Sequence, residues 1–262
     1  MTPRPVPDTM GSVEGDKEQS LIGHLVELRS RLLRAVVAVM VVFLGLVPFA
    51  NRIYAFIAAP SRGHLPEAAT MVAIDVASPF LTPIKLTFFV AMVVAMPVVL
   101  YQLWAFVAPG LYRHEQRLAK PLLASAVLLF YAGCAFAYFL VLPAVFAFLT
   151  SVAPEGVSVM TDISRYLDFV LVLFLAFGFS FEVPVAVVIL VLLGWVDVAQ
   201  LREARGYVVV GAFIVAAVIT PPDVISQLML AIPMCLLYEA GIVAAAMLAR
   251  RRAEPQEPAE RP

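Results

Sequence analysis

Residues 169–193 read FVLVLFLAFGFSFEVPVAVVILVLL, a run of 25 residues with one ionisable side chain, Glu182. An α-helix rises about 1.5 Å per residue, and the hydrocarbon core of a membrane is about 30 Å thick. About 20 apolar residues therefore suffice to cross it as a helix. This run predicts a membrane-spanning helix.

Five further apolar runs lie along the chain. Their approximate bounds are 35–56, 86–107, 122–149, 207–219 and 224–249. The run 207–219 is the fifth in chain order and would cover only about 20 Å as a helix, so it is either a short span or a re-entrant helix. We favour a short span, because an even number of crossings fits the distribution of charge.

The composition excludes several classes of protein. Hydrophobic residues make up 62% of the 262 residues and charged residues 14%, which is more apolar surface than a soluble domain can bury. The net charge of −1 provides no basic surface for nucleic acid. The sequence contains no CxxC, HExxH, GxSxG or phosphate-binding loop. We therefore expect an all-α, polytopic membrane protein that is not an enzyme and has no catalytic residue, metal site or cofactor.

The basic residues predict the orientation of the spans. Of the 18 Lys and Arg residues, 14 precede, follow or connect the spans on the side of the N-terminus, and 4 fall on the other side. Because cytoplasmic segments carry the excess of Lys and Arg, we expect six crossings with both termini in the cytoplasm. Disordered cytoplasmic tails, 1–20 and 250–262, would flank a membrane domain, 21–249.

A polar segment, LIGHLVELRSRLLR at 21–34, precedes the first span. Its leucines recur at helical spacing, while His24, Glu27, Arg31 and Arg34 fall on the other side. This pattern predicts an amphipathic helix that lies on the inner membrane surface and then turns into the first span. Glu27 either pairs with Arg31, four residues on, or offers its carboxylate to a basic partner.

A second polar segment, FVAPGLYRHEQRLAKP at 106–121, follows the second span on the inner side. Pro109 and Gly110 predict a turn. Glu115 lies among basic neighbours. It is either a solvated loop residue or a carboxylate placed to bind a guanidinium through two parallel hydrogen bonds.

Polar residues within or next to the later spans are the third feature. A carboxylate in the middle of a span costs about 2.5 kcal/mol or more on insertion scales, so we expect Glu182 to face the bundle interior or a water-filled cavity. Asp223 ends the segment TPPD, 220–223, and is placed to cap the last helix. Gln227 follows about one turn later, near the same face.

Four stretches together resemble the TatC family, the polytopic core of the twin-arginine protein translocase. They are LIGHLVELRSRLL at 21–33, ASPFLTPIKLTFFV at 77–90, LYQLWAFVAPGLYRHE at 100–115 and ITPPDVISQ at 219–227. The resemblance covers about 21–249.

The resemblance implies a fold, a location and a set of partners. It implies a concave, cupped bundle of six transmembrane helices with short fifth and sixth helices, in the bacterial inner (cytoplasmic) membrane. Such a protein binds the twin-arginine signal peptides of folded cargo and assembles with single-span TatA and TatB and with other TatC copies. The proton motive force drives export.

The resemblance also implies roles for particular residues. Glu27 and Glu115 would bind the signal peptide, because an arginine can form two hydrogen bonds with one carboxylate and a lysine cannot. The other implied positions are Arg29, Phe106 and Pro109 for signal-peptide binding, Glu182 and Gln227 on the concave face, and Pro60 and Asp223 on the outer side.

Two other functions stay open on the residues alone. A small secondary transporter could use Glu182 for proton coupling, although no internal repeat supports an inverted-repeat transporter. An intramembrane enzyme would need a nucleophile or metal ligands, and no such pattern is present in the sequence.

Overall fold

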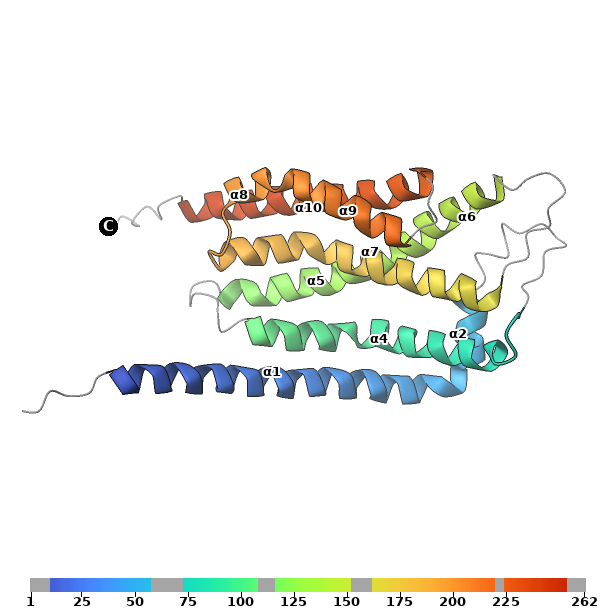
Figure 1. The fold of residues 1–262 in the computed structure, drawn as a ribbon, viewed down its shortest axis with the longest axis horizontal. Helices are drawn as coiled ribbons and strands as arrows, with labels where there is room; N and C mark the ends of the chain where they lie inside the picture. Colours follow the sequence, from blue (N-terminus) through green and yellow to red (C-terminus); the bar gives the residue numbers. More distant parts are fainter. Residues whose placement is uncertain (1–9, 58–72, 108–115, 152–161, 220–223, 254–262) are drawn as a thin grey trace, which may run out of the picture.

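The protein is almost entirely helical in the part that the computed structural model describes, residues 10–57, 73–107, 116–151, 162–219 and 224–253 (Figure 1). In chain order the elements are α1 (Met10–Leu46), η1 (Val47–Phe49), α2 (Ala50–Ile57), α4 (Ser78–Val107), α5 (Gln116–Phe136), η3 (Ala137–Val141), α6 (Leu142–Ser151), α7 (Ile163–Leu192), α8 (Val198–Glu203), α9 (Arg205–Ile219) and α10 (Val224–Ala253). Pro60, Pro109, Glu115, Asp223 and both chain ends, 1–9 and 254–262, lie outside the described residues.

The helices confirm the predicted membrane architecture. Five helical stretches are long and apolar enough to span, and α9, with 15 residues, is the short sixth. The last helix is longer than the family resemblance implied. α10 has 30 residues, because its mostly apolar sequence continues past Glu239 to the arginines that begin at Arg250. The first residues of α1 and the last of α10 lie at the same end of the bundle, here called the inner end (Figure 1).

The start of the membrane domain differs from the sequence prediction. We predicted a surface helix that turns into the first span, but α1 is one continuous helix from Met10 to Leu46. No proline occurs between these residues, so nothing interrupts the backbone hydrogen bonds. The chain first leaves the α-helical pattern in η1, which contains Pro48.

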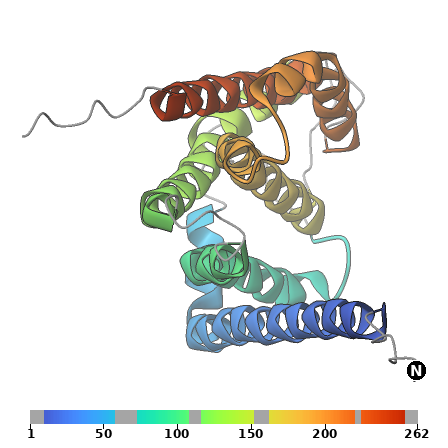
Figure 2. The same cartoon turned by 90° about the vertical axis from the view of Figure 1, so that its left-hand side faces the viewer.

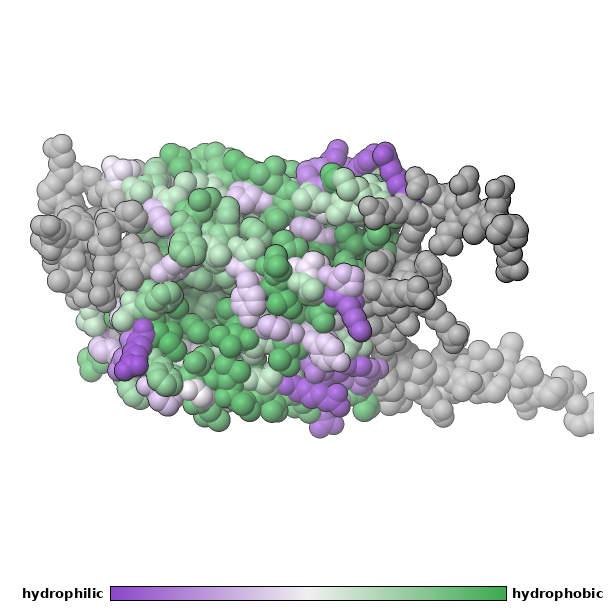
Figure 3. All heavy atoms as spheres, turned by 180° about the vertical axis from the view of Figure 1, so that it is seen from behind, coloured by the Kyte–Doolittle hydropathy of each residue, from purple (hydrophilic) through white to green (hydrophobic). Residues whose placement is uncertain are grey.

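The helices form a curved wall (Figure 2). α1 packs mainly against α4, α7 packs against both α5 and α10, and α9 packs against α10. Much of the surface of α1 remains exposed, including Leu32, Val37, Val41 and Leu44. Seen from behind, the molecule is hydrophobic across its middle, and its most hydrophilic residues lie toward the two ends (Figure 3). This distribution suits a protein surrounded by lipid.

Proline has different effects in different spans. η3 is a turn of π-helix that joins α5 to α6, and it lies just before Pro143. A proline removes one backbone N–H and cannot continue the regular ladder of hydrogen bonds, which explains the irregular turn. Pro97, Pro184 and Pro233 lie inside helices that continue without interruption.

Small residues allow α5 and α7 to approach closely. A Cβ atom added at Gly133 would lie 2.5 Å from the backbone oxygen of Phe177 on α7. A Cβ at Gly178 would lie 2.7 Å from the ring of Phe130, which is buried. Close approach of helix backbones at glycine is a common way to pack helices in membranes.

We predict that Gly133→Ala destabilises the protein by about 1–3 kcal/mol, because a backbone carbonyl cannot move aside for the added methyl group. Thermal unfolding of the purified protein in detergent measures the effect. Gly211→Ala on α9 is the control, because no atom lies within 4 Å of its added Cβ. Equal melting temperatures for the two variants would contradict the close approach of α5 and α7.

Candidate functional site

A cleft of about 150 Å³ separates α1 from α4 near the inner end of the bundle. It is lined by Leu28, Arg31, Leu32 and Ala35 of α1 and by Val99, Gln102, Leu103 and Phe106 of α4. Six of these eight side chains are apolar. The structure therefore brings Phe106, which is half-buried, next to the turn of α1 that follows Glu27.

Glu27 lies beside this cleft and is already paired. Arg31 donates two hydrogen bonds to the same carboxylate oxygen, Oε1, from Nε at 2.9 Å and from Nη2 at 2.5 Å. The Glu27 side chain is 40% exposed and the Arg31 side chain 21%. No described residue donates a hydrogen bond to the other oxygen, Oε2. The carboxylate can therefore accept a second cationic donor without first releasing Arg31.

Gln102 is a polar residue of the cleft that the sequence analysis missed. Its Oε1 atom is buried and accepts no hydrogen bond within the described part of the chain. A buried acceptor without a donor costs about 1–3 kcal/mol, so a bound N–H group would stabilise this position. The sequence contained a signal, because Gln102 is the only amide side chain in the apolar run 86–107.

The other predicted inner-end residues are not all brought together. Arg29 is exposed on α1. It lies two positions after Glu27, which places it about 200° around the helix and away from the carboxylate. Arg29 thus cannot share a ligand atom with Glu27.

Glu182 lies on α7, in the apolar run that the sequence analysis singled out. The residue is half-buried, and its Oε1 atom is buried without a hydrogen-bond partner among the described residues. α7 ends soon after it in a Schellman motif, in which Gly194, at φ +68°, donates to Val191 and Trp195 donates to Leu190.

Gln227 has a structural contact. Its Nε2 atom donates a hydrogen bond of 3.0 Å to the backbone carbonyl of Phe213. Because Gln227 belongs to α10 and Phe213 to α9, this bond links the two last helices. The side chain thereby helps to hold the short helix α9 in place.

Comparisons with known proteins agree on one family. The model of the family described as Sec-independent protein translocase protein (TatC) matches residues 23–233. The chain is 58% identical to a TatC from Azotobacter chroococcum over 92% of this chain and 94% of that protein. It is 59% identical to the Escherichia coli K12 TatC over 86% of this chain and 87% of that protein.

A solved structure has the same fold. A crystal structure described as the twin arginine translocase receptor TatC superposes with a TM-score of 0.78 at 37% sequence identity. The match covers 87% of this chain and all of the other.

Replacing Glu182 should stabilise the protein, because its buried Oε1 atom has no hydrogen-bond partner in the described part of the chain. We expect Glu182→Leu to raise the free energy of unfolding by about 1 kcal/mol or more, because a buried acceptor without a donor is lost. Thermal unfolding in detergent measures it. Glu239→Leu is the matched control, since Glu239 accepts a hydrogen bond from Arg205 at 2.7 Å and its loss should bring no gain. A destabilised Glu182→Leu protein would show that the carboxyl group has a partner.

Proposed function

The chain belongs to the TatC family of Sec-independent protein translocase proteins, and from that membership we propose that it is the subunit that binds twin-arginine signal peptides. It is a multi-pass membrane protein and a component of a protein translocase. The proposal rests on the Glu27 carboxylate, which lies beside an apolar cleft at the inner end and has one of its two oxygens bonded to Arg31.

Arginine is the residue that this carboxylate would select. A guanidinium presents parallel N–H groups to a carboxylate, whereas an ammonium acts as a point charge. Oε2 of Glu27 accepts no hydrogen bond from the described residues. An incoming arginine binds there first and then competes with Arg31 for Oε1. Arg31 is exchanged rather than lost, so the carboxylate is never left without a cation.

The cleft supplies the second part of the proposed site. Its apolar walls would receive an apolar side chain of the signal peptide, and Phe106 would contribute to this surface. Gln102 would accept a hydrogen bond from the peptide. Glu115 and Pro109, in the segment that follows α4, would provide the second carboxylate and the turn of the recognition loop, and Arg29 would flank the bound peptide.

Further parts of the proposal concern export itself. Glu182 and Gln227 would line the concave face along which the apolar part of the signal peptide moves, and Pro60 and Asp223 would act on the outer side. The short helix α9, with Val210 and Val218 exposed, would receive the helix of TatA or TatB. Other TatC copies would complete the complex in the bacterial inner membrane. The proton motive force would drive transport. The chain itself would not be an enzyme.

A proton-coupled transporter is the alternative that Glu182 supports, because its buried Oε1 atom has no hydrogen-bond partner among the described residues. Family membership favours the translocase.

Two substitutions on α1 test the proposed site in opposite directions. We expect Glu27→Gln to weaken signal-peptide binding about tenfold or more, because a charge-assisted hydrogen bond is lost. Arg31→Gln should strengthen binding about twofold, since it removes the i,i+4 competitor of the incoming arginine. Binding of a labelled twin-arginine peptide to membranes that contain each variant measures both. Normal binding by Glu27→Gln would refute the assignment.

The peptide provides an independent test. Replacing both of its arginines with lysines should weaken binding to the wild-type protein, because a lysine cannot form the parallel pair of hydrogen bonds. The loss should be smaller in the Glu27→Gln variant, since the selective carboxylate is absent. The four affinities form a double-mutant cycle. Equal losses in both proteins would show that Glu27 does not read the arginines.

A further inference from the structure

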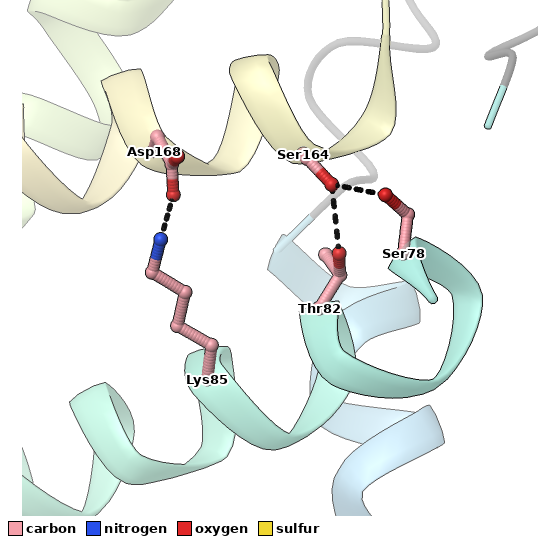
Figure 4. A network of polar contacts seen from close by, with 5 residues as sticks. All are labelled: Ser78, Thr82, Lys85, Ser164 and Asp168. Atoms are coloured by element: carbon pink, nitrogen blue, oxygen red, sulfur yellow. Dashed lines mark hydrogen bonds and ion pairs between the residues drawn. The ribbon is translucent and has the colours of Figure 1, made fainter. Parts of the chain in front are cut away.

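A cluster of polar residues joins α4 to α7 at the outer end of the bundle (Figure 4). Lys85 of α4 donates to Oδ1 of Asp168 on α7. Beside this ion pair, the Ser164 hydroxyl bonds to that of Ser78 at 2.7 Å and to that of Thr82 at 3.2 Å. The family resemblance, although it includes the stretch 77–90, implied no role for these residues, and the proposed signal-peptide site does not use them.

The helix lengths place the cluster near the boundary between the hydrocarbon core and the lipid headgroups. α4 and α7 have 30 residues each, or about 45 Å, against a hydrocarbon core of about 30 Å. If the excess is shared between the two ends, the core begins about five residues inside each helix. Lys85 lies seven residues after the start of α4, and Asp168 five after the start of α7. The ion pair is thus at the boundary between acyl chains and headgroups.

A cavity of about 410 Å³ opens beside these residues. The ion pair, the three hydroxyl groups and a second carboxylate, Asp75, line it together with apolar side chains. The Lys85 and Asp168 side chains are 59% and 46% exposed, so both can contact a molecule in the cavity. The lining therefore offers one cation, two anions and hydroxyl groups to a ligand.

One hydroxyl proton of the cluster remains free to donate to that ligand. Ser78, Thr82 and Ser164 carry three hydroxyl protons, and the two hydrogen bonds between them use two. The remaining proton and the other N–H groups of Lys85 can donate to an anion such as a phosphate. No described residue donates to Oδ2 of Asp168, so this oxygen and Asp75 can accept from a cation.

We propose that this cavity binds the headgroup of a phospholipid that carries a phosphodiester and a primary ammonium, which is phosphatidylethanolamine in the outer leaflet. Lys85 and the free hydroxyl proton bind the phosphate, and Asp168 and Asp75 accept from the ammonium. Phosphatidylcholine has no N–H to donate, and phosphatidylglycerol has no cation for the two carboxylates. This proposal does not depend on the signal-peptide site.

Native mass spectrometry of the purified full-length protein tests the selectivity. The protein is mixed with equal amounts of phosphatidylethanolamine, phosphatidylcholine and phosphatidylglycerol of the same acyl chains, and the retained lipids are counted. We expect preferential retention of phosphatidylethanolamine, and a decrease of about tenfold in that preference in Asp168→Asn, the size of one lost charge-assisted hydrogen bond. Equal retention of the three lipids by the wild type overturns the proposal.

Two further variants separate lipid binding from a structural role of the ion pair. The double variant Lys85→Asp and Asp168→Lys keeps a salt bridge between α4 and α7 but exchanges the positions of its two charges. The preference for phosphatidylethanolamine should be lost, while the melting temperature should stay the same. Arg205→Gln, which breaks the Arg205–Glu239 pair between α9 and α10, should retain the preference. An unchanged preference in the exchange variant overturns the assignment.

Soluble glycerophosphoethanolamine distinguishes a lipid from a free headgroup. It presents the same phosphodiester and ammonium without acyl chains, so at the lipid's own concentration it should not displace phosphatidylethanolamine. Equal competition by the soluble compound would show that the cavity takes a water-soluble ligand rather than a lipid.

Discussion

The structure depends on one constraint: within lipid, every backbone N–H and C=O group must find its hydrogen-bond partner inside the protein. Helices meet this demand locally, which is why nearly all of the described chain is helical. Polar side-chain atoms are under the same constraint, but less strictly. They either lie near the ends of the bundle, as in the pair of Glu27 and Arg31, or are few and costly in its middle, as in Glu182.

Features governed by this constraint could be predicted from the sequence. An apolar run of sufficient length becomes a span in any tertiary context, so the run 169–193 corresponds closely to α7. The pair of Glu27 and Arg31 was also predictable, because residues four positions apart on one helix must be neighbours. The extent of α1 was not predicted, because a polar helix on the membrane surface and a straight extension of the span have the same periodicity.

Features that depend on contacts between helices could not be predicted. Lys85 and Asp168 are 83 residues apart, and nothing in either local sequence fixes how α4 lies against α7. The same holds for Gln102, whose buried oxygen is defined by the approach of α1. The effect of a proline on its helix could not be predicted either. Pro143 follows a π-helical turn, whereas Pro97 lies inside a regular helix. The surroundings of each proline determine whether the freed carbonyl is accommodated.

The two polar ends differ in how a charged ligand can enter. At the inner end, the Arg31 guanidinium already neutralises Glu27. In the proposed site a second arginine would replace this partner, so no charge would lose its water without compensation. At the outer end, the ion pair between two helices would meet a headgroup that contains both charges. Binding would extend the pair by one positive and one negative charge and leave the net charge unchanged. In both places the resident ion pair compensates the charges in the absence of ligand. Ligand entry would then be an exchange of partners at the inner end and an extension of the pair at the outer end. Glu182 lies deeper, in the middle of the apolar run of α7, and its buried Oε1 atom has no such partner among the described residues.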